Sequence, residues 1–282
     1  MMSAAWLLLW QHLLPKDLLS ALVYRATRSR RAWLKQPLTR WFARAYGVDL
    51  AEAVNADLDS YATFNDFFTR ELKVGARPIE AGPTTVIAPA DGVLTEFGTI
   101  EGDQLLQAKG ISYSLADLLG ETGAAVDALR GGNYFTIYLA PFNYHRVHSP
   151  LAAALTRTRY IPGDRFSVSR ATAAVIGRLF CRNERAVCWF DGERGPMAVV
   201  LVGALNVSSI STLTRGEIAS GPPQHWPEAP PHAVARGAEI GRFNMGSTVI
   251  VLLGAPPLDW HARAKPGATV RMGEALGTLR RA

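Results

Sequence analysis

Short, apolar, β-branched runs separated by glycine and proline dominate the chain from about residue 84 onward, and they restrict the fold more than any other feature. Runs of this length and spacing are typical of strands joined by tight turns. Only brief helical patterns interrupt them, at residues 114–119 and 167–176. The sequence therefore predicts an α+β fold with a largely antiparallel β barrel or sandwich as its core. The expected strands span residues 85–87, 93–100, 134–139, 186–190, 197–202 and 248–253.

Residues 1–46 differ from the rest in charge and in texture. They hold eight Lys or Arg against one acid, a net charge of +7, whereas the other residues sum to −1. Helices with large apolar groups and basic partners are typical of a bilayer interface. Three short helices are predicted, at residues 7–14, 16–27 and 39–46, with Pro15 and Pro37 as breaks. Their apolar side comprises Trp6, Leu9, Trp10, Leu13, Leu18, Leu22, Trp33, Trp41 and Phe42.

We therefore expect residues 1–46 to form a helical membrane-interface segment and residues 47–282 to form the main domain. The alternative is that the aromatic side chains pack on the protein's own core and that the arginines are solvated. No apolar run approaches the roughly 18 residues that a spanning helix needs, so no transmembrane helix is expected. The near-neutral main domain argues against nucleic acid as a partner.

Three further expectations concern segments outside the strands. Residues 60–73 resemble an amphipathic helix that links the two parts of the chain. Residues 221–231 contain five prolines, which predicts a mobile loop. Cys181 and Cys188 have no neighbouring CxxC pair, so free thiols in a reducing compartment are expected rather than disulfides.

The tetrapeptide Met245-Gly246-Ser247-Thr248 lies inside a strand-like run at residues 241–253. The carbonyl of Gly246 has no side chain to shield it, and the hydroxyl of Ser247 follows directly. Such a peptide bond is well suited to attack by its own serine. Taken alone, however, Gly-Ser-Thr is common and more often forms a bulge or turn in a buried strand.

Candidate partners for that hydroxyl lie in two other segments. His145 and His148 are three residues apart, and His148 is a candidate general base because imidazole changes charge near neutral pH. Asp91 lies in a tight turn from which a carboxylate would reach an imidazole nitrogen. Asp91, His148 and Ser247 together match a triad that the fold assembles. The alternatives are a plain turn at Asp91 and packed rings or a metal pair at the histidines, but no further ligand cluster supports a metal.

Taken together, these segments resemble the phosphatidylserine decarboxylase family, whose members depend on a pyruvoyl group. No single motif decides the resemblance, but their order and spacing do. Met245 departs from the family pattern, in which leucine usually precedes Gly-Ser-Thr, and this exchange conserves apolar volume. The matching segments are residues 63–70, 88–92, 107–110, 144–148, 160–164, 183–187, 202–207 and 241–250.

The resemblance implies autocatalytic serinolysis of a zymogen at Gly246–Ser247, with Asp91, His148 and Ser247 as the processing triad. The products would be a long chain, 1–246, and a short chain, 247–282, which stay together as a heterodimer. The catalytic domain, residues 47–282, would then comprise residues 47–246 of the long chain and the whole short chain. Ser247 would become the covalent pyruvoyl cofactor. A Schiff base to this group would then convert phosphatidylserine into phosphatidylethanolamine, with His145 or His148 returning the proton.

The same resemblance implies partners and a location. Phosphatidylserine keeps its acyl chains in the bilayer, so the enzyme is expected to be peripheral on the cytoplasmic side of the inner membrane, bound to an anionic surface. A homodimer is left open. Rival readings are a soluble pyruvoyl-dependent amino-acid decarboxylase, a lipoyl-type carrier domain and a serine hydrolase. The carrier lacks its hairpin lysine, and the hydrolase lacks its Gly-x-Ser-x-Gly turn.

Overall fold

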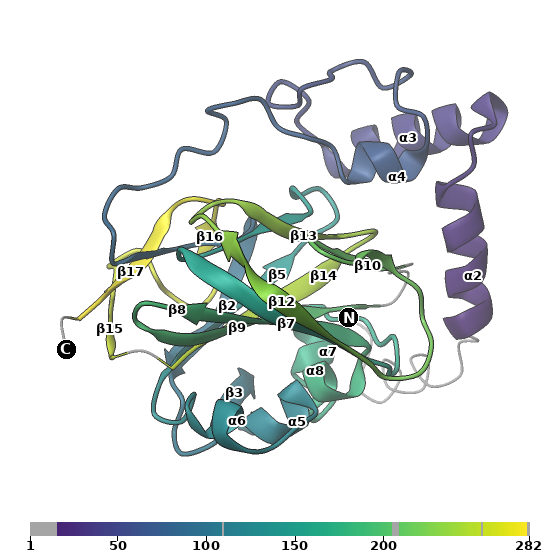
Figure 1. The fold of residues 1–282 in the computed structure, drawn as a ribbon. Helices are drawn as coiled ribbons and strands as arrows, with labels where there is room; N and C mark the ends of the chain where they lie inside the picture. Colours follow the sequence, from purple (N-terminus) through teal and green to yellow (C-terminus); the bar gives the residue numbers. More distant parts are fainter. Residues whose placement is uncertain (1–15, 109, 205–208, 255, 281–282) are drawn as a thin grey trace.

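The computed structural model describes residues 16–108, 110–204, 209–254 and 256–280, and its central feature is an eight-stranded antiparallel sheet (Figure 1). The helices are α2 (Lys16–Thr27), α3 (Ala32–Tyr46), α4 (Phe64–Phe68), α5 (Leu115–Leu119), α6 (Ala124–Asp127), α7 (Arg170–Ala173) and α8 (Leu179–Arg182). The strands are β1 (Thr85–Ile87), β2 (Gly92–Thr99), β3 (Gln104–Ala108), β4 (Ile111–Ser114), β5 (Asn133–Leu139), β6 (Arg146–His148), β7 (Ala153–Ile161), β8 (Arg185–Gly192), β9 (Gly195–Val202), β10 (Ile210–Thr212), β11 (Gly216–Ile218), β12 (Gln224–Val234), β13 (Glu239–Phe243), β14 (Ser247–Leu253), β15 (Leu258–Trp260), β16 (Thr269–Val270) and β17 (Ala275–Leu279).

The large sheet has the strand order β12-β7-β8-β9-β14-β5-β2-β16. Its two edge strands, β12 and β16, do not pair with each other, so the described part of the chain forms no closed barrel. Smaller sheets have the orders β1-β17-β15, β11-β10-β13-β6 and β3-β4. The predicted α+β class and the mostly antiparallel, sandwich-like core are confirmed, and all six predicted strands are present.

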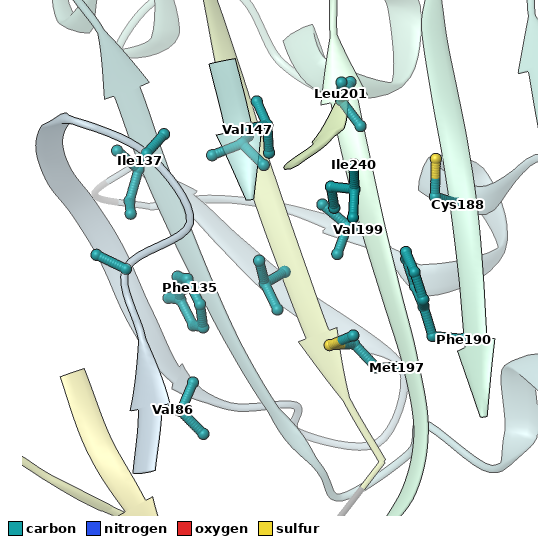
Figure 2. Packing of buried hydrophobic residues seen from close by; sticks show 14 of the residues in the cluster. Val86, Phe135, Ile137, Val147, Cys188, Phe190, Met197, Val199, Leu201 and Ile240 are labelled. Carbon is teal, nitrogen blue, oxygen red and sulfur yellow. The ribbon is translucent and has the colours of Figure 1, made fainter. Parts of the chain in front are cut away.

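Strand β14 shows why this sheet is buried on both faces. Val249, Val251 and Leu253 belong to one apolar cluster, whereas Ile250 and Leu252 belong to another. Because successive side chains of a strand point to opposite faces, the continuous apolar run supplies both clusters. Figure 2 shows part of the first cluster, in which Val199 and Leu201 of β9 lie near Val147 and Ile240.

The N-terminal helices agree with the sequence only in part. Helix α2 has the predicted bounds, and the predicted helix at residues 7–14 lies outside the described residues. Helix α3 begins at Ala32, well before the predicted start, and it contains Pro37, which the sequence analysis had placed as a break. A proline beyond the first turn removes one intrahelical hydrogen bond and crowds the carbonyl four residues earlier, so the helix needs support from other contacts. Buried contacts of Phe42 and Ala43 with α4 support the rest of α3.

The remaining departures are local. The helix predicted at residues 60–73 is shortened to α4, where the side chain of Thr63 caps the N-terminus and Leu72 instead forms a β-bridge with Ala53. The mobile loop predicted at residues 221–231 is wrong, because most of it forms strand β12. This strand pairs only with β7, and prolines are tolerated on an edge strand because its outer side needs no backbone donors.

Two further findings concern the cysteines and the apolar character of the helices. Cys181 and Cys188 are both free, as predicted, and burial raises the pKa of each thiol to about 12. Within the described part of the chain, none of the helices combines the length and apolar character needed to cross a bilayer.

Candidate active site

The connection between β13 and β14 carries the predicted reactive bond. Strand β13 ends at Phe243, residues 244–246 make the turn, and β14 begins at Ser247. Met245 adopts φ = 107°, a left-handed conformation that is rare for a side chain of this size. Backbone strain of this kind costs about 1–3 kcal/mol and persists only where the surroundings impose it. The strain lies one residue before Gly246.

The turn is fixed by hydrogen bonds on both sides. The side-chain amide of Asn244 donates to the hydroxyls of Ser209 and Ser211, at 2.7 and 3.1 Å. The side chain of Asn65, in α4, donates to the Oδ1 atom of Asn244 at 3.1 Å. The backbone N–H of Phe243 donates to the carbonyl of His145, which brings the histidine segment beside this turn. These contacts explain how the strained conformation is held.

Ser247 is completely buried, and its hydroxyl has no hydrogen-bond partner among the described residues. Its backbone lies opposite Leu139 of β5, and Thr248 lies opposite Tyr138 of β5 and Val202 of β9. A buried hydroxyl without a partner is unfavourable, and most such groups in folded proteins are paired. Together with the strain at Met245, this unpaired hydroxyl marks the turn as a candidate reactive centre.

His145 lies in an almost wholly apolar environment. Its Nδ1 atom is 2.8 Å from the carbonyl of Asn143, and its ring centroid lies 4.0 Å from that of Phe68. A carbonyl only accepts, so Nδ1 carries the proton and Nε2 is the free, buried nitrogen. Burial lowers the pKa of His145 to about 3, and the charge of Arg70 contributes in the same direction. The imidazole is therefore neutral at pH 7.

His148 has a defined tautomer. Its Nδ1 atom lies 2.8 Å from the carbonyl of Gly237 and therefore donates, which leaves Nε2 as the basic nitrogen. The hydroxyl of Tyr144 lies 3.1 Å from Nε2 and donates to it. Burial lowers the pKa of His148, and the Gly237 carbonyl and the nearby charges of Glu239 and Asp91 oppose this shift. This tautomer is the one that a base needs to accept a proton at Nε2.

The carboxylate of Asp91 is buried and is paired with other groups. Arg77 donates to it from Nε at 2.9 Å and from Nη2 at 2.5 Å, and the backbone N–H of Met272 donates at 2.9 Å. Asp91 and His148 share no hydrogen bond in the described residues, although the backbone N–H of His148 donates to the carbonyl of Pro89, two residues before Asp91. The structure thus brings Asp91 near His148 without the predicted direct contact.

A cavity of about 230 Å³ opens at Gly246. Its lining is mostly apolar and aromatic and also includes two serines, Ser167 and Ser169. Residues from α3 form part of its wall, so the N-terminal helices and the reactive turn meet here. The lining includes Phe42, Tyr46, Tyr138, Ser167, Ser169 and Met245.

Several residues of this site are absent from the sequence predictions. Tyr144 was available from its position four residues before His148, in the same motif. Arg77, Asn65 and Gly237 carried no signal, because their partners are 14, 179 and 89 residues away along the chain. Within the described ranges, no group of three or more His, Cys, Asp or Glu side chains is arranged to hold a metal ion.

The chain is similar to known proteins over nearly its whole length. A family model described as phosphatidylserine decarboxylase matches residues 64–278, and a second model, described as PSD, matches residues 7–47. A phosphatidylserine decarboxylase proenzyme of Ectopseudomonas mendocina is 47% identical over 278 residues, which cover 96% of each chain. Proenzymes with the same description from Pseudomonas fluorescens and Azotobacter vinelandii are 48% and 46% identical and cover 95% and 96% of each chain.

Fold, site and matches together define this protein as an enzyme, a decarboxylase. The chain belongs to the phosphatidylserine decarboxylase family.

Proposed function

We propose that this protein decarboxylates phosphatidylserine to phosphatidylethanolamine after it cuts its own chain between Gly246 and Ser247. The observation that carries the proposal is the buried, unpaired hydroxyl of Ser247 next to the strained residue Met245. The relatives are described as phosphatidylserine decarboxylase proenzymes, which supports both the substrate and the need for processing.

The proposed cut begins when His148 takes the hydroxyl proton of Ser247. Its Nε2 atom is the basic nitrogen, because Gly237 holds the proton on Nδ1. Tyr144, which now donates to Nε2, has to release it first. The oxygen of Ser247 then attacks the carbonyl carbon of Gly246, the C–N bond breaks, and the nitrogen takes up a proton, so that the amide becomes an ester. Loss of the α-proton of Ser247 then expels the Gly246 carboxylate by β-elimination, and the dehydroalanine that remains takes up water and loses ammonia to leave a ketone. In this scheme the charge of Asp91, which acts to raise the pKa of His148, stabilises the imidazolium that forms.

A pyruvoyl group formed from Ser247 would supply a carbonyl that accepts the electrons of the bond broken as carbon dioxide leaves. The surroundings of Ser247 fit such a group, because its hydroxyl has no hydrogen-bond partner among the described residues and a cavity opens at the preceding residue, Gly246. The apolar walls of the cavity would strip water from the substrate carboxylate and so favour its loss.

His145 and His148 differ as candidates for returning the proton. With a pKa of about 3, His145 is neutral at pH 7 and offers only the proton on Nδ1, which the Asn143 carbonyl holds. The pKa of His148 is also lowered, but its Nε2 bonds to an O–H donor rather than lying unpaired. These contacts favour His148, relayed through Tyr144, over His145.

The proposed long chain, 1–246, and short chain, 247–282, would remain a heterodimer. Strand β14 of the short chain lies between β5 and β9 of the long chain. Strand β16 pairs with β2, and β17 pairs with β1. A cut at the start of β14 removes none of these pairings. The pairings between the two pieces would therefore survive the cut.

The helices α2 and α3 support peripheral binding to an anionic membrane surface, which we assign to the cytoplasmic side of the inner membrane. Trp33 and Trp41 are 69% and 59% exposed, and Leu22 is 54% exposed. Large apolar side chains at such exposure mark an interaction surface. The basic residues of the same helices supply attraction to anionic lipid.

The experiment that tests the proposal is an intact-mass measurement of the purified protein beside a Ser247→Ala variant. The wild type should yield two chains, the shorter one with an N-terminus that lacks a free amine. The variant should remain one chain and release no carbon dioxide from phosphatidylserine. A Thr248→Ala variant, altered at the neighbouring hydroxyl, should still be cut. An active, uncut wild-type protein would end the proposal.

A further inference from the structure

Arg77 binds the carboxylate of Asp91 through two of its three guanidinium nitrogens. Its Nε and Nη2 atoms bind both oxygens of Asp91, and its Nη1 atom donates to Glu52 at 2.8 Å and to its own neighbour, the Ala76 carbonyl. The side chains of Arg77 and Asp91 are only 7% and 8% exposed. Burial acts to lower the pKa of Arg77, but its bonds to Asp91 and Glu52 outweigh burial and raise it. The guanidinium is therefore always charged.

Asp91 depends on this guanidinium. A buried carboxylate is strongly unfavourable without a counter-ion and hydrogen-bond donors. Arg77 supplies both, in the planar forked geometry that matches a carboxylate. The only other donor to Asp91 among the described residues is the backbone N–H of Met272. Without Arg77, Asp91 would lose its charge partner and its fixed orientation.

The segment that carries Asp91 is also bound to His148. The carbonyl of Pro89 accepts from the backbone N–H of His148, and Ala88 exchanges backbone hydrogen bonds with Gly273 and Glu274. Residues 88–91 therefore lie between strand β6 and the turn at residues 271–274. Arg77 also holds this segment, through its bonds to the side chain of Asp91. A shift of Asp91 would be transmitted directly to the strand that ends in His148.

We propose that Arg77 is a positioning residue of the self-cutting reaction, which holds Asp91 at the distance and orientation from which it can couple to His148. The inference rests on the proposed function, since it assigns a role within the processing triad. Arg77 does not touch the reacting bond and acts only through Asp91. Glu52 supports it by holding the Nη1 end, and Glu52 in turn accepts from Arg271 at 3.0 Å.

The test follows the cutting of the newly made full-length chain over time in cell-free synthesis. Arg77→Gln should slow cutting at least tenfold, and Arg77→Lys, which keeps the charge but loses the fork, should fall between it and the wild type. Arg263→Gln is the matched control, because Arg263 forms an exposed ion pair with Glu80. It should be cut at the wild-type rate.

A double mutant separates this inference from the proposed triad. If Arg77 acts through Asp91, Asp91→Asn combined with Arg77→Gln should be cut no more slowly than Asp91→Asn alone. Wild-type cutting of Arg77→Gln, with Asp91→Asn slowed, would overturn the inference and leave the triad standing. Wild-type cutting of Asp91→Asn would overturn the triad's carboxylate and this inference together.

A chemical rescue keeps the inference testable if Arg77→Gln folds poorly. In Arg77→Ala, added methylguanidinium should restore cutting severalfold by filling the vacated space, whereas tetramethylammonium at the same ionic strength should not. The rescue should be absent when Asp91→Asn is also present. Equal rescue with and without Asp91 would overturn the inference, because a loss of general packing does not depend on that carboxylate.

Discussion

Folded proteins generally bury apolar side chains and expose polar ones, and two regions of this molecule depart from that pattern. One is the turn between β13 and β14, and the other is the pair of helices α2 and α3. At the turn, polar groups are buried inside the protein: the Ser247 hydroxyl and the Nε2 atom of His145 have no hydrogen-bond partner among the described residues. On the helices, large apolar side chains such as Trp33 and Trp41 are exposed. Buried polar groups and exposed apolar patches are the informative exceptions in a folded protein.

The two regions are suited to different functions, chemistry at the turn and membrane binding at the helices. Unpaired polar groups in an apolar site are reactive, because no hydrogen bond has to be broken before they act. Exposed aromatic groups with basic neighbours are suited to a lipid surface. The cavity at Gly246 joins the two regions, since Phe42 and Tyr46 of α3 line it together with Met245. Binding at the surface and chemistry at the turn are thereby brought to one place.

The largest effect expected at the turn comes from His148. His148→Ala should slow cutting by about 10²–10⁴-fold, the usual contribution of a general base. In the wild type the cutting rate should rise with pH while His148 loses its proton. The midpoint of this rise should lie below pH 6.5, because burial lowers the pKa of His148 from that ordinary value. His225→Ala, at an exposed position of β12, should be cut normally.

His145 should make the turn region sensitive to acid. Its pKa is about 3 when folded and 6.5 when unfolded, so only the unfolded chain takes up this proton as the pH falls. The stabilising contribution is complete above pH 6.5 and declines toward pH 3, by about 1.4 kcal/mol for each pH unit. Urea unfolding of Ser247→Ala with and without His145→Gln measures the difference. An identical pH dependence in both would show that His145 is not a buried neutral imidazole.

The exposed aromatic residues of α3 should control membrane binding. The double substitution Trp33→Ala and Trp41→Ala should weaken vesicle binding by about 10- to 100-fold, because each tryptophan buries apolar surface in the interface. The measurement is sedimentation with phosphatidylcholine vesicles, with and without phosphatidylglycerol. Leu106→Ala is the control, since β3 lies on the opposite side of the sheet from α3 (Figure 1). If the double variant binds vesicles as tightly as the wild type, the tryptophans of α3 do not contribute to membrane binding.

The sequence predicted the strands well because their apolar runs determine them directly. Residues 248–253 are apolar at nearly every position, and β14 supplies two clusters from them. The error at residues 221–231 has the opposite cause. Whether a proline-rich segment pairs depends on its being an edge strand, which is a property of the whole sheet. In the same way, Pro37 inside α3 depends on the contacts of Phe42 with α4.

The site was predictable in its residue types but not in its pairings. Ser247, His145, His148 and Asp91 stand in recognisable motifs. The partner of Asp91 is Arg77, and the partner of the His148 Nδ1 atom is the Gly237 carbonyl. Such pairings arise only when distant segments pack, so no local pattern carries them. The left-handed conformation of Met245 is equally invisible, because glycine rather than methionine is the residue that signals it.

The smallest expected effect concerns the strain at Met245. If the left-handed conformation at φ = 107° helps to expose the Gly246 carbonyl, Met245→Gly should slow cutting about fivefold, which corresponds to about 1 kcal/mol of the strain that such residues store. Glycine adopts this conformation freely and would remove the strain. Met245→Leu is the matched control, because it keeps both the strain and the apolar volume, and its cutting rate should match the wild type. Equal rates in all three chains would show that the strain only accommodates the turn, and the reactivity of the bond would then rest on the buried hydroxyl and the imidazole alone.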